Sequence, residues 1–164
     1  MIYVFWNKYL FLVAYAFRRM KLQFLINPES TNDPVSYYLN KLDIQYSIGS
    51  AEEGGRHAAL SLLDSLRKSI PVFASANHPL RQVEELRPGN LVLAQQSGIP
   101  ILPIYCKSLW SIKIKLKTGR FILPLPFNSV EVILGNPVKI NPFDDLGLIQ
   151  GVKNKILKDL DSKD

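Results

Sequence analysis

Apolar and polar positions along this chain follow two different periods, one typical of strands and one typical of helices. Short runs rich in β-branched and aromatic residues predict buried strands at residues 1–6, 22–26, 44–48, 70–74 and 99–104. Between these runs, apolar residues recur at helical spacing, which predicts helices at residues 8–20, 34–42, 56–68, 90–96 and within 142–164. Strands that alternate with helices are typical of a sheet covered by helices. We therefore expect one α/β domain over residues 1–164, with a mostly parallel central sheet and helices on both faces.

Two of the predicted strands are expected to lie at the centre of that sheet. Residues 70–74 and 99–104 are near-continuous apolar runs. Such runs are typical of parallel strands that are covered on both faces. We therefore expect these two strands to be adjacent, parallel and buried.

A later segment has a different pattern, because its side chains alternate in character. Residues 109–116 place Trp110 and Ile112 on one side and Lys113 and Lys115 on the other. This alternation predicts a half-exposed strand with a basic outer face. Residues 129–134 predict a further strand.

The most apolar stretch is YLFLVAYAF, at residues 9–17, and basic residues flank it on both sides. It is too short to cross a membrane, since a spanning helix needs about 20 residues. Its basic cluster, Arg18 and Arg19, follows the apolar run instead of preceding it, unlike a secretory signal. Two placements remain open for this short helix, burial in the core or a position on a membrane surface.

Composition and charge narrow the classes of function. Apolar residues make up 47% of the chain and charged residues 21%, as in ordinary globular proteins. The net charge is +6, and the basic residues between Ile101 and Val130 number five, with no acidic residue among them. This surplus favours anionic partners such as an anionic membrane surface. A nucleic-acid partner is not expected, because no predicted helix has a basic face and the basic residues are not interleaved with stacking aromatics.

Familiar catalytic motifs are absent from the sequence. It contains no glycine-rich nucleotide loop, no HExxH motif and no GxSxG motif. One cysteine, Cys106, and two histidines exclude a disulfide framework and make a metal site improbable on composition, so no metal is expected. Of the histidines, His78 follows a predicted strand, where α/β folds place functional loops.

Three stretches carry a resemblance to a known family. The first is YSIGSAEEGG at residues 46–55. The second begins at Val72 and contains a Pro-Gly pair and the strand SGIPILP at residues 97–103. The third is RFILPLPF at residues 120–127, with Gly-Asn-Pro at 135–137. In combination they resemble the lysophospholipid acyltransferase superfamily, in a small bacterial branch of unknown function related to lipid A acyltransferases, over residues 1–137.

The resemblance implies a glycerolipid acyltransferase-like fold and a specific chemistry. In that superfamily a histidine deprotonates the hydroxyl of the acceptor, which then attacks an acyl thioester. The implied co-substrate is therefore acyl-coenzyme A or an acyl carrier protein, with no bound cofactor. The implied partners are a phospholipid, lysophospholipid or lipid A-type acceptor and an anionic membrane surface. The implied location is the cytoplasm, at the periphery of the inner face of a bacterial membrane.

This sequence departs from the family pattern at its polar positions. Asn7 stands at the position of the general-base histidine and Asn77 at that of an aspartate, while Ile48 replaces the arginine expected to bind the acceptor phosphate. An asparagine amide does not titrate near neutral pH, so Asn7 cannot act as a general base. His78 is the candidate for a relocated base. The predicted catalytic positions are thus Asn7, Asn77 and His78, and the predicted acceptor-binding positions are Gly49, Ser50, Pro79 and Arg81.

Two functions follow from these observations. One is a lysophospholipid acyltransferase-like protein whose acyl transfer is weak or undetectable. The alternative is a non-catalytic module with the same fold that binds lipid or a membrane surface.

Overall fold

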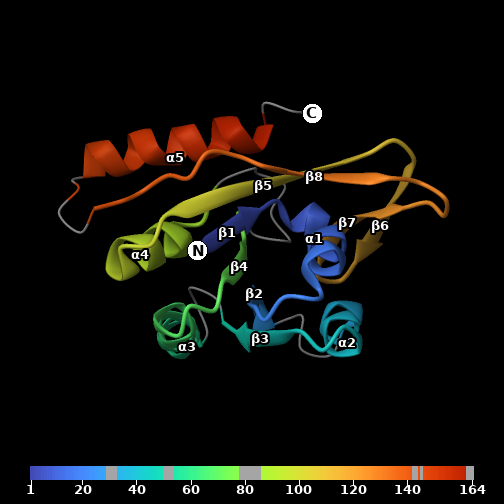
Figure 1. Ribbon diagram of the computed structural model, residues 1–164, viewed down its shortest axis with the longest axis horizontal. Coiled ribbons are helices and arrows are strands. Elements are labelled where there is room, and N and C mark those ends of the chain that lie inside the picture. The colour runs from blue at the N-terminus through green and yellow to red at the C-terminus, as the bar shows by residue number, and fades with distance from the viewer. Residues whose placement is uncertain (29–32, 50–53, 78–85, 142–143, 145, 162–164) are drawn as a thin grey trace.

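A six-stranded sheet forms the centre of the protein, as seen in the computed structural model, which describes residues 1–28, 33–49, 54–77, 86–141, 144 and 146–161 (Figure 1). The strand order is β3-β2-β4-β1-β5-β8. In chain order the strands are β1 (Ile2–Phe5), β2 (Gln23–Ile26), β3 (Gln45–Ile48), β4 (Val72–Ser75), β5 (Ile101–Ser108) and β8 (Val130–Leu134). Only β8 pairs antiparallel, at the edge beside β5. The prediction of a single α/β domain with a mostly parallel sheet is confirmed.

Helices cover both faces of the sheet, as expected. One face carries α1 (Leu10–Phe17) and α2 (Pro34–Lys41), and the other carries α3 (Gly55–Arg67) and α4 (Pro88–Ser97) (Figure 1). This division follows from right-handed crossovers, because the chain steps outward from β1 to β3 and then returns through β4 to β5. The last helix, α5 (Leu146–Asp161), contacts β5.

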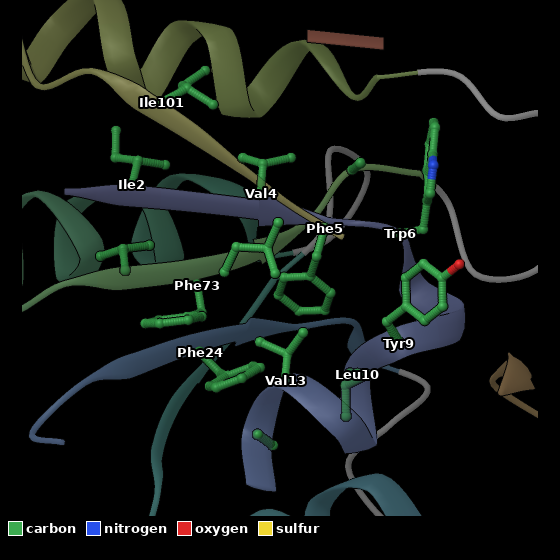
Figure 2. Close-up of a cluster of buried hydrophobic side chains, with 14 of the residues drawn as sticks. Ile2, Val4, Phe5, Trp6, Tyr9, Leu10, Val13, Phe24, Phe73 and Ile101 are labelled. Atoms are coloured by element: carbon green, nitrogen blue, oxygen red, sulfur yellow. The ribbon is translucent and has the colours of Figure 1, made fainter. Parts of the chain in front are cut away.

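The core forms around β1, which lies between β4 and β5. Ile2 pairs in register with Val72 on one side and with Ile101 on the other. Figure 2 shows the apolar side chains of β1 among those of its neighbours, with Phe24 and Phe73 stacked at a centroid distance of 5.3 Å. The prediction that strands 70–74 and 99–104 are adjacent is wrong, although both are buried and parallel. The reason is that β1 is equally apolar and competes for the same central position.

The apolar helix predicted at residues 8–20 divides into a short 3-10 turn, η1 (Asn7–Tyr9), and α1. Residues 10–14 of α1 are buried, and Phe11 packs on Phe121 at a centroid distance of 4.8 Å. Of the two placements left open by the sequence, the structure has the helix packed in the core. Within the described ranges, no helix has the length and hydropathy that a membrane span requires.

A separate two-stranded hairpin packs over η1 and α1. It consists of β6 (Ser111–Leu116), which the sequence predicted, and β7 (Gly119–Pro124), which it did not. On the inner side Ile114 lies opposite the buried Phe121, while Lys113 and Lys115 are exposed. The predicted basic outer face of this strand is therefore observed.

Candidate functional site

Three strands of the sheet end in asparagines at the same edge. Asn27 directly follows β2, whereas Asn7 and Asn77 are each the second residue after β1 and β4. Because these strands are parallel, their carboxyl ends meet at one edge, which is where open α/β sheets bind ligands. Asn7 and Asn27 are buried, with 6% and 7% of their surface exposed. We call Asn7, Asn27 and Asn77, at the carboxyl ends of these three strands, the amide edge.

Asn7 and Asn77 contact each other directly. The backbone N–H of Asn7 donates a hydrogen bond to Oδ1 of Asn77, with an N–O distance of 2.9 Å. The side-chain Nδ2 of Asn7 is buried and has no hydrogen-bond partner among the described residues. Leaving such a donor unpaired costs about 1–3 kcal/mol, so a buried amide in this state is suited to donate to an oxygen of a ligand.

Arg87 and Asn90 connect the start of α4 to the amide edge. Nη1 of Arg87 donates to Oδ1 of Asn27 at 2.8 Å, and the backbone N–H of Arg87 donates to the carbonyl of Ala76 at 2.7 Å. Nδ2 of Asn90 donates to the carbonyl of Ser75 at 2.9 Å. Arg87 thus holds a cationic group at this edge, which the sequence reasoning missed. Its only sequence signal is an arginine directly before the Pro-Gly pair that begins a helix.

A pocket of about 440 Å³ lies between α3 and α4. Gly49, Arg56 and Arg87 are among its lining residues. Both helices begin at this pocket without a side-chain cap and without an acidic residue in the first turn, so their positive ends face it. Two arginines and two helix N-termini make the described part of this pocket suited to an anion. The cationic groups of this pocket are thus the guanidinium groups of Arg56 and Arg87.

Position 49 requires glycine because any larger side chain would collide with α3. A Cβ atom at this position would lie 2.5 Å from Cβ of Ala58 in α3. The first turn of α3 therefore packs directly on the residue after β3. Gly49 and Ala58 both line the pocket between α3 and α4.

An apolar groove of about 760 Å³ lies on the other face of the sheet, between α1, α2, the hairpin and β8. Its walls include Phe11, Tyr15, Ile114, Leu116 and Leu123. The aliphatic and aromatic character of these walls makes the groove suited to a hydrocarbon chain.

A second groove, of about 960 Å³, lies on the other side of the hairpin. Lys8, Lys107, Lys113 and Glu131 line it, together with Cys106. Burial raises the pKa of the Cys106 thiol to about 12, so this cysteine is a neutral packing residue at physiological pH. It is not an activated nucleophile.

The predicted site residues divide into two groups. The structure brings Asn7 and Asn77 together and puts Gly49 in the pocket at the same edge. Ser50, His78, Pro79 and Arg81 lie outside the described residues. The described residues contain no group of three or more histidine, cysteine, aspartate or glutamate side chains that could hold a metal ion.

Comparison with known proteins gives one distant relative. No family model matches the chain, and no solved structure matches it. A protein of Rickettsia prowazekii (strain Madrid E), itself uncharacterized, is 21% identical over 140 residues. The match covers 85% of this chain but 64% of the relative, so the chain spans less than two thirds of that protein.

Proposed function

We propose that this protein is a lysophospholipid acyltransferase-like protein with a glycerolipid acyltransferase-like fold. It binds a lysophospholipid or lipid A-type acceptor and transfers acyl groups weakly or not at all. The observation that carries this proposal is the hydrogen-bonded pair of Asn7 and Asn77 at the amide edge. The sequence resemblance to the superfamily supplies the class of substrate.

The Asn7–Asn77 pair favours binding of an acceptor with little acyl transfer. General-base catalysis contributes about 10²–10⁴-fold to reactions of this kind, and an amide at position 7 cannot supply it. An amide can still donate hydrogen bonds. Nδ2 of Asn7, unpartnered among the described residues, would donate to an oxygen of the acceptor. Binding is therefore expected to survive the loss of the base.

Two pockets fit two chemical groups of such lipids, a phosphate and an acyl chain. A phosphate would accept charge-assisted hydrogen bonds from Arg56 and Arg87 in the pocket between α3 and α4. An acyl chain would lie in the apolar groove, whose volume is in the range of about 300–1,000 Å³ typical of small-molecule sites. The two sites lie on opposite faces of the sheet, so we assign them to separate lipid groups and not to one extended molecule.

Activity is tested by acyl transfer from acyl-coenzyme A, and from acyl carrier protein, to a lysophospholipid. We expect weak or undetectable transfer by the wild type and by His78→Ala. The triple variant Asn7→His, Ile48→Arg, Asn77→Asp should exceed the wild type by about 10²–10⁴-fold, and Asn7→His alone should gain less. Robust wild-type turnover that His78→Ala abolishes would contradict the proposal and make His78 the base. Turnover that survives His78→Ala would mean that the active site lies elsewhere.

The alternative is a purely non-catalytic lipid-binding module, which the buried amide pair also fits. The triple variant separates the two functions. A triple variant that binds the lysophospholipid but transfers nothing would favour the module. A gain in transfer would favour a degenerate enzyme.

Binding is tested with a lysophospholipid below its critical micelle concentration, by titration calorimetry. Ala16 lies on α1 and lines the apolar groove with an exposed side chain. Ala16→Trp should fill the groove and weaken binding at least tenfold. Arg19→Trp is the matched control, because Arg19 is also exposed but does not line the groove. Equal affinity of both variants and the wild type would exclude the groove as the chain site.

A further inference from the structure

Large apolar side chains gather at one end of the hairpin and are exposed to solvent. Leu109 and Trp110 are 83% and 65% exposed, and Phe127 is completely exposed. Leu125 beside them is 40% exposed. They come from two turns, one between β5 and β6 and one between β7 and β8, at the right-hand end of these strands in Figure 1. We call residues 109–110 and 125–128 the hairpin tip, meaning the end of the hairpin opposite the turn between β6 and β7.

Hydrogen bonds hold the two turns of the tip side by side. The backbone N–H of Leu125 donates to the carbonyl of Trp110 at 3.0 Å. Nδ2 of Asn128 donates to the same carbonyl and to Oγ of Ser108, both at 2.6 Å. These polar contacts join the two turns and involve none of the exposed apolar side chains. The exposed side chains of the tip are therefore available to a partner.

The backbone of Phe127 supports a function for this end. Its φ angle is +60°, in the left-handed region that bulky residues rarely adopt. A strained conformation that displays an aromatic side chain to solvent is typical of a binding element, since folding alone gains nothing from it. Tryptophan and phenylalanine are also residues that enter the interface of a lipid bilayer.

Basic residues flank the tip on both strands. Lys107 precedes Trp110 by three residues and Lys113 follows it by three, which is about 10 Å along an extended chain. Lys107 lies opposite Glu131 in the ladder of β5 and β8, whereas Lys113 lies opposite Ile122. Farther along the hairpin Lys115 faces Arg120, so the charge beyond the tip is also positive.

We propose that the hairpin tip docks on an anionic lipid bilayer. Leu109, Trp110 and Phe127 enter the headgroup region, and Lys107 and Lys113 contact the lipid phosphates. A bilayer fits this surface better than a protein does, because four projecting side chains are few for an interface that buries about 800 Å² on each partner. Insertion into lipid needs only a few such side chains together with nearby positive charge.

The tip also provides a route for a lipid chain from the bilayer into the apolar groove. Pro124, next to the tip, and Asn128, within it, line that groove. A chain that leaves the bilayer at the tip enters the groove without crossing water. This second step rests on the proposed function, whereas docking of the tip does not.

The test is flotation with vesicles of phosphatidylcholine alone and of phosphatidylcholine mixed with phosphatidylglycerol. The wild type should float with the mixed vesicles, and Trp110→Ser with Phe127→Ser should weaken this binding at least tenfold. The matched control is Leu60→Ser with Val92→Ser, which removes two exposed apolar side chains from α3 and α4. Lys107→Gln with Lys113→Gln should weaken binding to the mixed vesicles by about fivefold for each charge.

Tryptophan fluorescence reports the position of the tip directly. The chain has two tryptophans, and Trp6 is buried, so a blue shift on vesicle binding reports Trp110. Absence of wild-type flotation, equal binding by the tip and control variants, or binding without a blue shift would overturn the proposal. The lysophospholipid titration is independent of docking. A tip variant that keeps its affinity for the monomeric lipid but loses vesicles supports docking, and a wild type that binds vesicles but no monomeric lipid contradicts only the proposed function.

Discussion

The amide edge and the hairpin tip reverse the usual distribution of polar and apolar side chains. At the amide edge, Asn7 and Asn27 are polar and buried. The Asn77 side chain accepts a hydrogen bond from the backbone of Asn7, and the Asn27 side chain accepts one from Arg87. At the hairpin tip, Trp110 and Phe127 are apolar and exposed. Both arrangements cost free energy in an isolated protein. These are the two regions for which lipid contacts are proposed above.

The two regions differ in the kind of partner they fit. Neutral amides in a buried edge can recognise oxygen atoms but cannot move protons near neutral pH. Exposed aromatics beside lysines fit a lipid interface and need no fine geometry. The amide edge therefore offers buried amide donors and acceptors, whereas the hairpin tip offers exposed aromatic side chains near lysines.

The largest expected change in stability comes from the buried Phe73, and the exposed Phe127 is its comparison. Phe73 is fully buried and stacks on Tyr3 at 4.5 Å, so Phe73→Ala should destabilise the protein by about 3–5 kcal/mol. Phe127→Ser should change the free energy of unfolding by less than about 0.5 kcal/mol, because Phe127 is exposed. Denaturant unfolding measures both values. Similar losses for the two variants would show that the tip is packed and would remove the contrast.

The next effect tests the hydrogen bond within the amide edge. Asn77→Ala removes the acceptor of the Asn7 backbone N–H and should destabilise the protein by about 1–3 kcal/mol. Asn77→Asp keeps an acceptor oxygen at the same position and is the control. Thermal unfolding at neutral pH compares the two. An alanine variant as stable as the wild type would show that this contact does not hold the edge together.

A smaller effect is expected where α2 meets the hairpin. The side chain of Asp33 accepts a hydrogen bond from the backbone N–H of Val35 at the start of α2, and another from Oγ1 of Thr118 in the turn of the hairpin. Asp33→Ala should cost about 0.5–2 kcal/mol through loss of the cap. Asp33→Asn, which keeps a capping oxygen, should cost less. If circular dichroism and unfolding give equal losses for both, charge and not capping is the dominant contribution.

The smallest effect concerns Cys106 and pH. Burial raises the thiol pKa in the folded protein to about 12 from an ordinary value of 9.0, so the unfolded chain loses this proton first. The contribution of the neutral thiol to stability is complete below about pH 9 and is lost as the pH rises toward 12. We expect the difference in unfolding free energy between the wild type and Cys106→Ala to shrink by on the order of 1 kcal/mol from pH 8 to pH 10. A difference that does not change with pH would contradict burial of this thiol.

Native-state alkylation gives an independent measurement of the same burial. Iodoacetamide should label Cys106 slowly in the folded protein and quickly in denaturant, because the reactive form is the thiolate. Rapid labelling of the native protein would place the thiol in contact with solvent.

The sequence determined the local elements of this protein and its class. The positions of β1 to β5, the helices between them and the exposed basic side of β6 all follow from the period of apolar residues. A period can be read locally, because each side chain needs only its near neighbours in the chain to define a face. The sequence also selected Asn7 and Asn77 as candidate site residues, and the two are in contact in the structure.

Only the tertiary structure decided how those elements are combined. Several strands are equally apolar, and β1 is the one that pairs with β4 on one side and β5 on the other. The local pattern of apolar residues does not predict which strand takes this position. The hydrogen bond of Arg87 to Asn27 joins residues 60 positions apart, and the tip joins turns on either side of the hairpin. Contacts of this kind form only in the folded protein. They depend on how whole helices and strands pack together and not on the order of residues within one element.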